Sequence, residues 1–158
     1  MAETEYGREV SDMQSEVEKI LREGELCVLC TSQGDIPDAS LMLYVYDDSC
    51  AKLLMLTLKE TTKYANILRN PNVSLLVDTR DKALDPSSQT RALTIRGRAS
   101  ILEDGPVARQ LLDQLVKKHR SLSNLASNHS VRLIEVSIQG VLFLENVDKV
   151  NDLDLHGK

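Results

Sequence analysis

The chain is organised around one segment of mixed character, residues 53–77, which reads LLMLTLKETTKYANILRNPNVSLLV. Two apolar runs, at 53–56 and 73–77, enclose a polar stretch with two lysines, three threonines and the pair Asn70-Pro71. Short apolar runs bounded by polar residues predict buried strands, and a helix is expected to end before a proline. The segment therefore predicts a strand, a turn, a short helix and a second strand.

The predicted helix begins among positive charges. Lys59 and Lys63 bracket its start, where the helix dipole normally favours acidic residues. Backbone N–H groups at a helix N-terminus bind phosphate readily, so two cations beside threonine hydroxyls indicate an anion site. An ordinary structure also explains these residues, because Thr61 can cap the helix, Glu60 partly offsets the lysines, and Lys63 can point into water. The segment alone favours that simpler interpretation, since short motifs give many false matches.

Patterns on both sides of this segment predict a mainly β protein with helices. A meander of antiparallel strands precedes the segment, and its third strand is apolar on both faces, so both sides of that strand must be covered. Helical spacing predicts an N-terminal helix over about 10–23 and another from Gly105-Pro106 to His119. The stretches 78–91 and 121–130 are predicted to be polar connections, and the polar tail 147–158 to contain at most one short helix. Six segments have strand patterns: 26–31, 38–46, 51–57, 73–77, 93–101 and 132–144. Six antiparallel strands with fitted helices predict a small β-barrel with helical caps.

Composition narrows the class of protein. With 158 residues, we expect one domain with a core over about 26–145. The net charge of −5 and 42% hydrophobic residues argue against nucleic-acid binding and indicate an ordinary globular protein. No apolar run has the length of a membrane span, no signal peptide is visible, and three cysteines are typical of free thiols, so we expect a cytoplasmic protein. Cys27 and Cys30 lie three apart on a predicted strand, which places them on opposite faces and predicts core cysteines rather than a metal or redox site.

Three stretches, taken in order, carry a family resemblance. They are the strand Gly34-Asp-Ile-Pro-Asp-Ala-Ser-Leu-Met-Leu-Tyr44, the segment from Thr57 through Lys63 to Asn70-Pro71, and the strand Arg91-Ala-Leu-Thr-Ile-Arg-Gly97. Together they resemble the FMN-binding split-barrel proteins related to pyridoxamine 5′-phosphate oxidase. The resemblance implies a six- to seven-stranded antiparallel split β-barrel with peripheral helices, which forms a homodimer with FMN at the subunit interface.

The resemblance also implies which strand residues contact the cofactor. Ser40, Leu41 and Met42 on the second strand would lie along the isoalloxazine and the ribityl chain. Leu56 and Thr57 would add contacts at the end of the third strand.

The phosphate would be bound at the helix start. Thr62 and Lys63 fall where the family has its phosphate-binding pair, although the family commonly has arginine at the position of Thr62. Lys59 is then expected to compensate for the missing charge. Arg91 and Ala92 fall near positions from which the partner subunit touches the flavin. With this context, the anion site at Lys63 becomes the favoured interpretation.

The function expected is that of a flavin-dependent oxidoreductase acting on an unidentified small molecule. The chain continues Leu144-Glu-Asn-Val-Asp-Lys and has no tryptophan, whereas the oxidase holds its substrate with a C-terminal segment rich in tryptophan, arginine and histidine, so oxidation of pyridoxamine phosphate is not expected. No catalytic side chain and no metal site can be assigned. Two alternatives remain: a non-catalytic flavin-binding module, and a haem-binding or haem-degrading relative. Against haem, His119, His129 and His156 are all predicted to be solvated surface residues.

Overall fold

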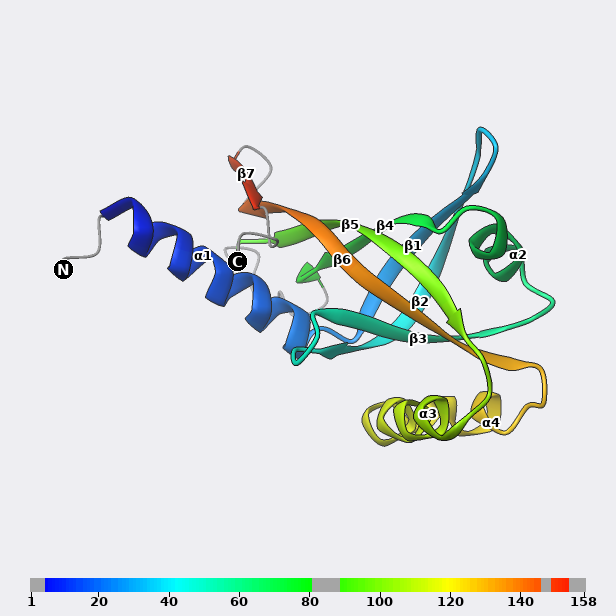
Figure 1. Cartoon of the computed structure of the whole chain (residues 1–158). Helices are drawn as coiled ribbons and strands as arrows, with labels where there is room; N and C mark the ends of the chain where they lie inside the picture. The colour runs from blue at the N-terminus through cyan, green and yellow to red at the C-terminus, as the bar shows by residue number, and fades with distance from the viewer. Residues whose placement is uncertain (1–4, 81–88, 146–148, 154–158) are drawn as a thin grey trace.

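Six antiparallel strands close into a barrel in the computed structural model, which describes residues 5–80, 89–145 and 149–153 (Figure 1). The strand order is β3-β2-β1-β4-β5-β6, pairing of β3 with β6 closes the ring, and β7 adds to the free edge of β6. The elements in chain order are α1 (Glu5–Glu23), β1 (Leu26–Gln33), β2 (Ile36–Asp47), β3 (Lys52–Leu58), α2 (Thr62–Arg69), β4 (Asn72–Asp78), β5 (Arg91–Leu102), α3 (Pro106–Lys118), the 3₁₀ turn η2 (Arg120–Leu122), α4 (Ser123–Ala126), β6 (Val131–Glu145) and β7 (Lys149–Leu153). The mainly β, split-barrel fold predicted from the sequence is confirmed.

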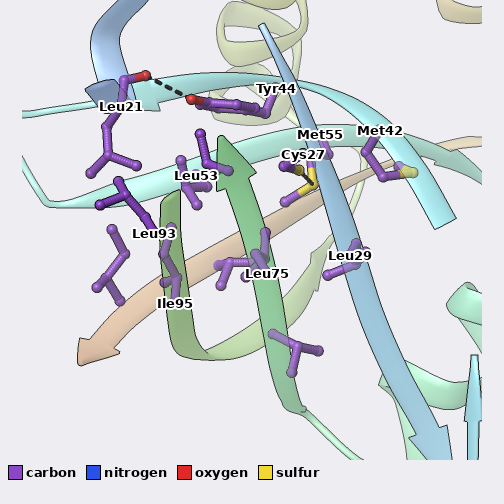
Figure 2. Close-up of a cluster of buried hydrophobic side chains, with 14 of the residues drawn as sticks. Leu21, Cys27, Leu29, Met42, Tyr44, Leu53, Met55, Leu75, Leu93 and Ile95 are labelled. Atoms are coloured by element: carbon purple, nitrogen blue, oxygen red, sulfur yellow. Dashed lines mark hydrogen bonds between the residues drawn. The ribbon is translucent and has the colours of Figure 1, made fainter. Parts of the chain in front are cut away.

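The barrel interior is apolar because alternate residues of each strand point inward. Side chains from α1 and from strands around the barrel meet there, as Figure 2 shows. Cys27 lies in this core with its Sγ 3.8 Å from Sδ of Met55, and burial raises the pKa of the Cys27 thiol to about 12. Cys27 is therefore the inert core cysteine that the strand pattern predicts.

The outer face of β3 carries a second apolar cluster. Leu53 and Met55 point into the barrel, whereas Leu54 and Leu56 pack outside it against Leu115 of α3 and the neighbouring α4. All four β3 side chains are at most 5% exposed. The two-sided apolar pattern of this strand is thus explained by a helical cover, and Figure 1 shows α3 and α4 on that side of the barrel.

The barrel turns a corner at Gly97. The β5–β6 register shifts between Arg96 and Gly97, which makes a β-bulge. A Cβ on Gly97 would lie 2.6 Å from Cγ1 of Val136, so this close strand approach requires glycine.

A polar junction joins the C-terminal ends of α1 and α3 to β2. The Tyr44 hydroxyl donates to the Leu21 carbonyl at 3.0 Å (Figure 2), and Lys118 Nζ donates to the Gly24 carbonyl at 2.8 Å. His119, which ends α3, lies 2.7 Å through Nε2 from the Tyr44 carbonyl and is only 6% exposed. The prediction of a solvated His119 is wrong, because this ring fills the junction beside the barrel.

Two other sequence predictions differ from the structure. The stretch 121–130 contains η2 and α4, where only a polar connection was expected. The tail contributes the strand β7 at 149–153, where at most a helix was expected, because β6 offers a free edge for pairing. Most of the predicted loop at 78–91 lies outside the described residues. None of the described helices combines the length and the apolar character needed to span a membrane.

Candidate functional site

The start of α2 has the polarity of an anion site. Thr61 is the N-cap, and its Oγ1 accepts a hydrogen bond from the Tyr64 N–H at 3.4 Å. The first turn contains no acidic residue and includes Lys63. A negatively charged ligand is therefore favoured here by the positive end of the helix dipole, by N–H groups of the first turn and by the lysine.

A short chain of hydroxyls connects the end of β3 to this helix start. Thr57 Oγ1 lies 2.8 Å from Thr61 Oγ1, and the Thr61 hydroxyl is also 2.8 Å from the Leu58 carbonyl. Thr57 is 3% exposed, so its hydroxyl needs such a partner. These bonds fix the N-cap relative to the barrel wall.

Glu60 is bonded to the residue before β6. Its carboxylate accepts a hydrogen bond from the Ser130 hydroxyl at 2.8 Å, and this bond is the main cause that lowers the pKa of Glu60. The charge of Lys59 also lowers the pKa of Glu60, in agreement with the prediction that Glu60 partly offsets the lysines. The Lys59 N–H donates to the Ser130 carbonyl at 3.1 Å, which anchors the same turn to the start of β6.

A hollow of about 460 Å³, called here the α2 hollow, opens beside this helix start. Its floor and walls are mainly leucines, and its polar groups are Thr57, Thr61 and Lys63. Its volume is within the roughly 300–1,000 Å³ typical of small-molecule sites. The lining residues are Leu26, Leu41, Met42, Leu43, Leu56, Thr57, Leu58, Thr61, Lys63, Leu122 and Leu125. The arrangement is suited to a ligand with a large apolar body and an anionic end.

The structure brings together half of the residues predicted for the site. Those that line the α2 hollow are Leu41, Met42, Leu56, Thr57 and Lys63. Ser40, Lys59 and Thr62 lie next to lining residues in the chain but do not line the hollow themselves. Thr62 and Lys59 are exposed, and Ser40 lies 3.5 Å from a carboxylate oxygen of Asp38.

Sequence reasoning missed several lining residues. Thr61 was expected as a possible helix cap and among the threonine hydroxyls beside the anion, but it was not named as a cofactor contact; it caps α2 and lines the hollow. Leu122 and Leu125 lie in η2 and α4, within the stretch that was predicted to be a polar connection. Their spacing of three is the helical signal that could have revealed them.

Arg91 and Ala92 occupy a different part of the molecule. Arg91 starts β5, forms an ion pair with Glu16 of α1, and lines a separate hollow of about 470 Å³ with Phe143 and Glu145. Ala92 is paired with Asp78 and Leu144 in the sheet. A role on the partner subunit's flavin, which the resemblance implies, stays a prediction for both residues.

Metal and haem ligation find little support in the described part of the chain. No cluster of three or more His, Cys, Asp or Glu side chains with metal-binding geometry occurs there. His119 is bonded to the Tyr44 carbonyl, and His129 is an exposed residue that lines a hollow beside α3. His156 lies outside the described residues.

Comparison with known proteins agrees with this geometry. The profile of the family described as Pyridoxamine 5′-phosphate oxidase matches residues 13–145. No curated protein matches the sequence. A putative pyridoxamine 5′-phosphate oxidase from Listeria innocua is similar in structure, with 23% identity, a TM-score of 0.63, and coverage of 89% of this chain and 98% of the other.

Two further similar structures have different ligands in their descriptions. An FAD-binding protein from Mesorhizobium loti has 18% identity and a TM-score of 0.68, with coverage of 80% of this chain and 90% of the other. HutZ, a haem storage protein from Vibrio cholerae, has 18% identity and a TM-score of 0.70, with coverage of 86% and 98%. The likeness to these structures shows a shared fold, while the profile match extends over most of the chain: the protein belongs to the pyridoxamine 5′-phosphate oxidase family of split-barrel proteins.

Proposed function

We propose that this protein binds FMN in the α2 hollow as a homodimer and acts as a flavin-dependent oxidoreductase on a small molecule. The observation that carries the proposal is the α2 hollow itself. It joins a leucine-lined space to a helix start that contains Lys63 and no acidic residue in its first turn. The leucine-lined space suits an isoalloxazine ring, and the helix start with Lys63 suits a terminal phosphate.

The residues present fit a flavin mononucleotide. Lys63 and first-turn N–H groups of α2 would hold the phosphate. Leu41, Met42 and Leu56 would contact the apolar ring. When bound, the flavin supplies the redox chemistry, and the protein supplies binding, orientation and electrostatics. Because the walls are mainly apolar, they would exclude water from the ring.

A second copy of the chain would complete this site. Leu26 is 42% exposed and Leu41 is 70% exposed, and both line the α2 hollow on the outer face of β1 and β2. Leu43 and Leu76 flank them on the same sheet. Large exposed apolar side chains that gather on one face are typical of interaction surfaces. We therefore assign this face, defined by Leu26, Leu41, Leu43 and Leu76, to the homodimer contact.

The visible absorption spectrum of the purified protein tests the cofactor. We expect a flavin spectrum, either as purified or after incubation with FMN followed by gel filtration. Lys63→Ala should weaken FMN binding roughly 10- to 100-fold, since hydrogen bonds to charged groups contribute about 1.5–3 kcal/mol. Lys117→Ala, an exposed lysine in the last turn of α3, is the matched control and should bind FMN as the wild type does. Equal FMN affinity in Lys63→Ala and the wild type would remove the phosphate assignment.

Reduction of the bound flavin distinguishes an enzyme from a binding module. Oxidation of NADH or NADPH, with bleaching of the flavin band, is expected of the enzyme and not of the module. The haem alternative rests on the similar fold of HutZ. Of the histidines in the described residues, neither lines the α2 hollow. Haem titration should accordingly give no Soret shift typical of an axially ligated iron, and a strong one would favour haem over FMN.

A further inference from the structure

A second hollow, of about 260 Å³, lies between the start of α3 and the start of β6. It is called here the α3 hollow. Four leucines form its apolar part: Leu56, Leu102, Leu112 and Leu133. Lys63 and the hydroxyls of the α2 hollow do not line it, although Leu56 lines both hollows. A ligand bound here would therefore occupy a separate site, one side chain away from the proposed flavin site.

Positive charge gathers around the α3 hollow. Arg109 and Arg132 line it with His129, and Asp104 is the one lining carboxylate. The two arginines and the aspartate together carry a net charge of +1. Arg109 is joined to Asp104 only through Nε at 3.3 Å, and both side chains are about 70% exposed (69% and 71%). An exposed pair of this kind is weak, so it leaves the Arg109 guanidinium able to contact an anion.

Arg132 is oriented by the backbone. Its Nη1 donates to the Val131 carbonyl at 2.6 Å and, more weakly, to the His129 carbonyl at 3.4 Å. A guanidinium has five N–H donors, so these two bonds leave donors on Nε and Nη2 for a ligand. Arginine suits carboxylates in particular, because two parallel N–H groups match the two carboxylate oxygens.

The α3 helix adds a third favourable element at the same place. Its N-cap is Gly105, which provides no side-chain cap, and its first turn has no acidic residue. Ala108, in that first turn, lines the hollow. The positive end of a 13-residue helix therefore faces the same space as the two arginines.

From this arrangement we propose that the α3 hollow binds a small aliphatic carboxylate, with its carboxylate between Arg109 and Arg132 and its chain on the four leucines. The hollow, at about 260 Å³, is smaller than the α2 hollow of about 460 Å³, so a short ligand suits it. Octanoate is a suitable probe because it joins one carboxylate to a short apolar chain.

Octanoate and octanamide provide a matched pair of probes. The two molecules have nearly the same shape and differ in charge. Calorimetric titration of the full-length protein should show binding of octanoate at least tenfold tighter than that of octanamide. Amide chemical-shift changes on adding octanoate should be largest at 105–109 and 126–133. Equal binding of the two probes, or no binding of octanoate, would overturn the proposal.

Variants locate the binding. Arg132→Gln and Arg109→Gln should each weaken octanoate binding about tenfold or more, and Ala126→Phe, which fills the hollow from α4, should abolish it. Arg98→Gln, on the outer face of β5, is the matched control and should bind as the wild type does. Circular dichroism verifies folding, and because Arg109 is exposed, its variant keeps the test valid if Arg132→Gln does not fold.

The proposal is separable from the proposed flavin function. Lys63→Ala should bind octanoate with unchanged affinity, since Lys63 does not line the α3 hollow. If Lys63→Ala alone abolished octanoate binding, the carboxylate would be bound in the α2 hollow, and the α3 site would be refuted whether or not FMN binds. A wild-type protein that binds octanoate but does not bind FMN would refute only the flavin assignment.

Discussion

At the scale of single residues, Gly24 sets how closely α1 approaches β2. A Cβ at this position would lie 2.1 Å from the Tyr44 hydroxyl oxygen and 2.9 Å from the Ile20 carbonyl oxygen. That tyrosine is fully buried and bonded to Leu21. Gly24→Ala must therefore displace a buried ring, and we expect it to lower the free energy of unfolding by about 1–3 kcal/mol in denaturant titration.

Gly105 provides the matched control for this substitution. A Cβ there would come no nearer than 4.0 Å to the Glu103 carbonyl oxygen, and the extended backbone of Gly105 suits any residue. Because alanine is a poorer N-cap than glycine, Gly105→Ala should lower the free energy of unfolding, but by less than about 1 kcal/mol. If the two variants lost the same free energy of unfolding, contact with Tyr44 would not be the reason that Gly24 must be glycine.

Asp47 makes a pH-dependent contribution at the β2–β3 turn. Its carboxylate accepts bonds from the Ser49 hydroxyl at 2.6 Å and the Ser49 N–H at 3.1 Å, and the hydroxyl bond is the main cause that lowers the pKa of Asp47 below its ordinary value of 3.8. Because the pKa of Asp47 is lower in the folded chain than in the unfolded chain, its carboxylate stabilises the fold at any pH above the unfolded-state pKa. This stabilisation is lost as the pH falls through the folded-state pKa.

The variant Asp47→Asn tests this contribution. The asparagine amide keeps an acceptor for Ser49 but carries no charge. The Tm of the variant should therefore be about 1–2 °C below that of the wild type at pH 7 and pH 5. This difference in Tm should narrow at pH 3, which lies below the ordinary pKa of 3.8, because the carboxylate of the unfolded chain is then mostly protonated. Asp113→Asn, at an exposed position of α3, should show no gap at any of these pH values. A gap for Asp47→Asn that persisted unchanged at pH 3 would mean that the ionised carboxylate is not the source.

At the scale of elements, α2 depends on one hydroxyl. Thr61 accepts from Tyr64, is bonded to the Leu58 carbonyl, and lies in hydrogen-bond distance of the buried Thr57. Thr61→Ala removes the cap and leaves Thr57 with a weaker partner, so unfolding in denaturant should show a loss of about 1–2 kcal/mol. Thr62→Ala, at the exposed first position of the same helix, should be neutral within about 0.5 kcal/mol. Comparable losses at both positions would refute the capping role.

The elements were predictable where a local pattern decides them. The alternation in β5 is visible in the sequence because its inward positions are buried and its outward positions are exposed. The apolar run of β3 is visible because both of its faces are buried. The four-residue helix α4 was not predicted, since its leucines are few and lie among serines and asparagines, and only packing on Leu133 and its neighbours orders it. Strand β7 was missed for a similar reason: pairing with β6 creates it, not its own composition.

The candidate site was predictable from charge but not from packing. The charge of Lys63 at a helix start is visible in the sequence, whereas the family resemblance made its anion site the favoured interpretation and placed Leu56 and Thr57 in the site. The sequence did not reveal that Leu122 and Leu125 would close the same hollow, since their contact with β3 joins segments more than 60 residues apart. The bond between Glu60 and Ser130 was not predicted for the same reason, because the two residues are 70 positions apart.

At the scale of the whole molecule, the described residues leave apolar side chains exposed on the outer face of β1 and β2. The outer face of β3 is covered by α3 and α4. Helix α2 and its C-cap contact β1 through two side-chain hydrogen bonds of 3.0 Å, from Asn66 to Thr31 and from Asn70 to Ser32. The outer face of β1 and β2 carries Leu41 at 70% exposure. An exposed leucine beside the proposed flavin site is explained if a second copy of the chain covers it.

Leu41→Glu tests this homodimer contact. The side chain is already exposed in one chain, so the substitution should leave the monomer folded, but it would place a charge within the apolar face. We expect light scattering coupled to gel filtration to give a dimer mass for the wild type and a monomer mass for Leu41→Glu. Leu68→Glu on α2, where the leucine is 62% exposed, is the matched control and should remain dimeric. Because the dimer would complete the α2 hollow, Leu41→Glu should also lose FMN binding while Leu68→Glu keeps it. A monomeric wild type, or a Leu41→Glu variant that remains dimeric, would show that this face does not join the two copies.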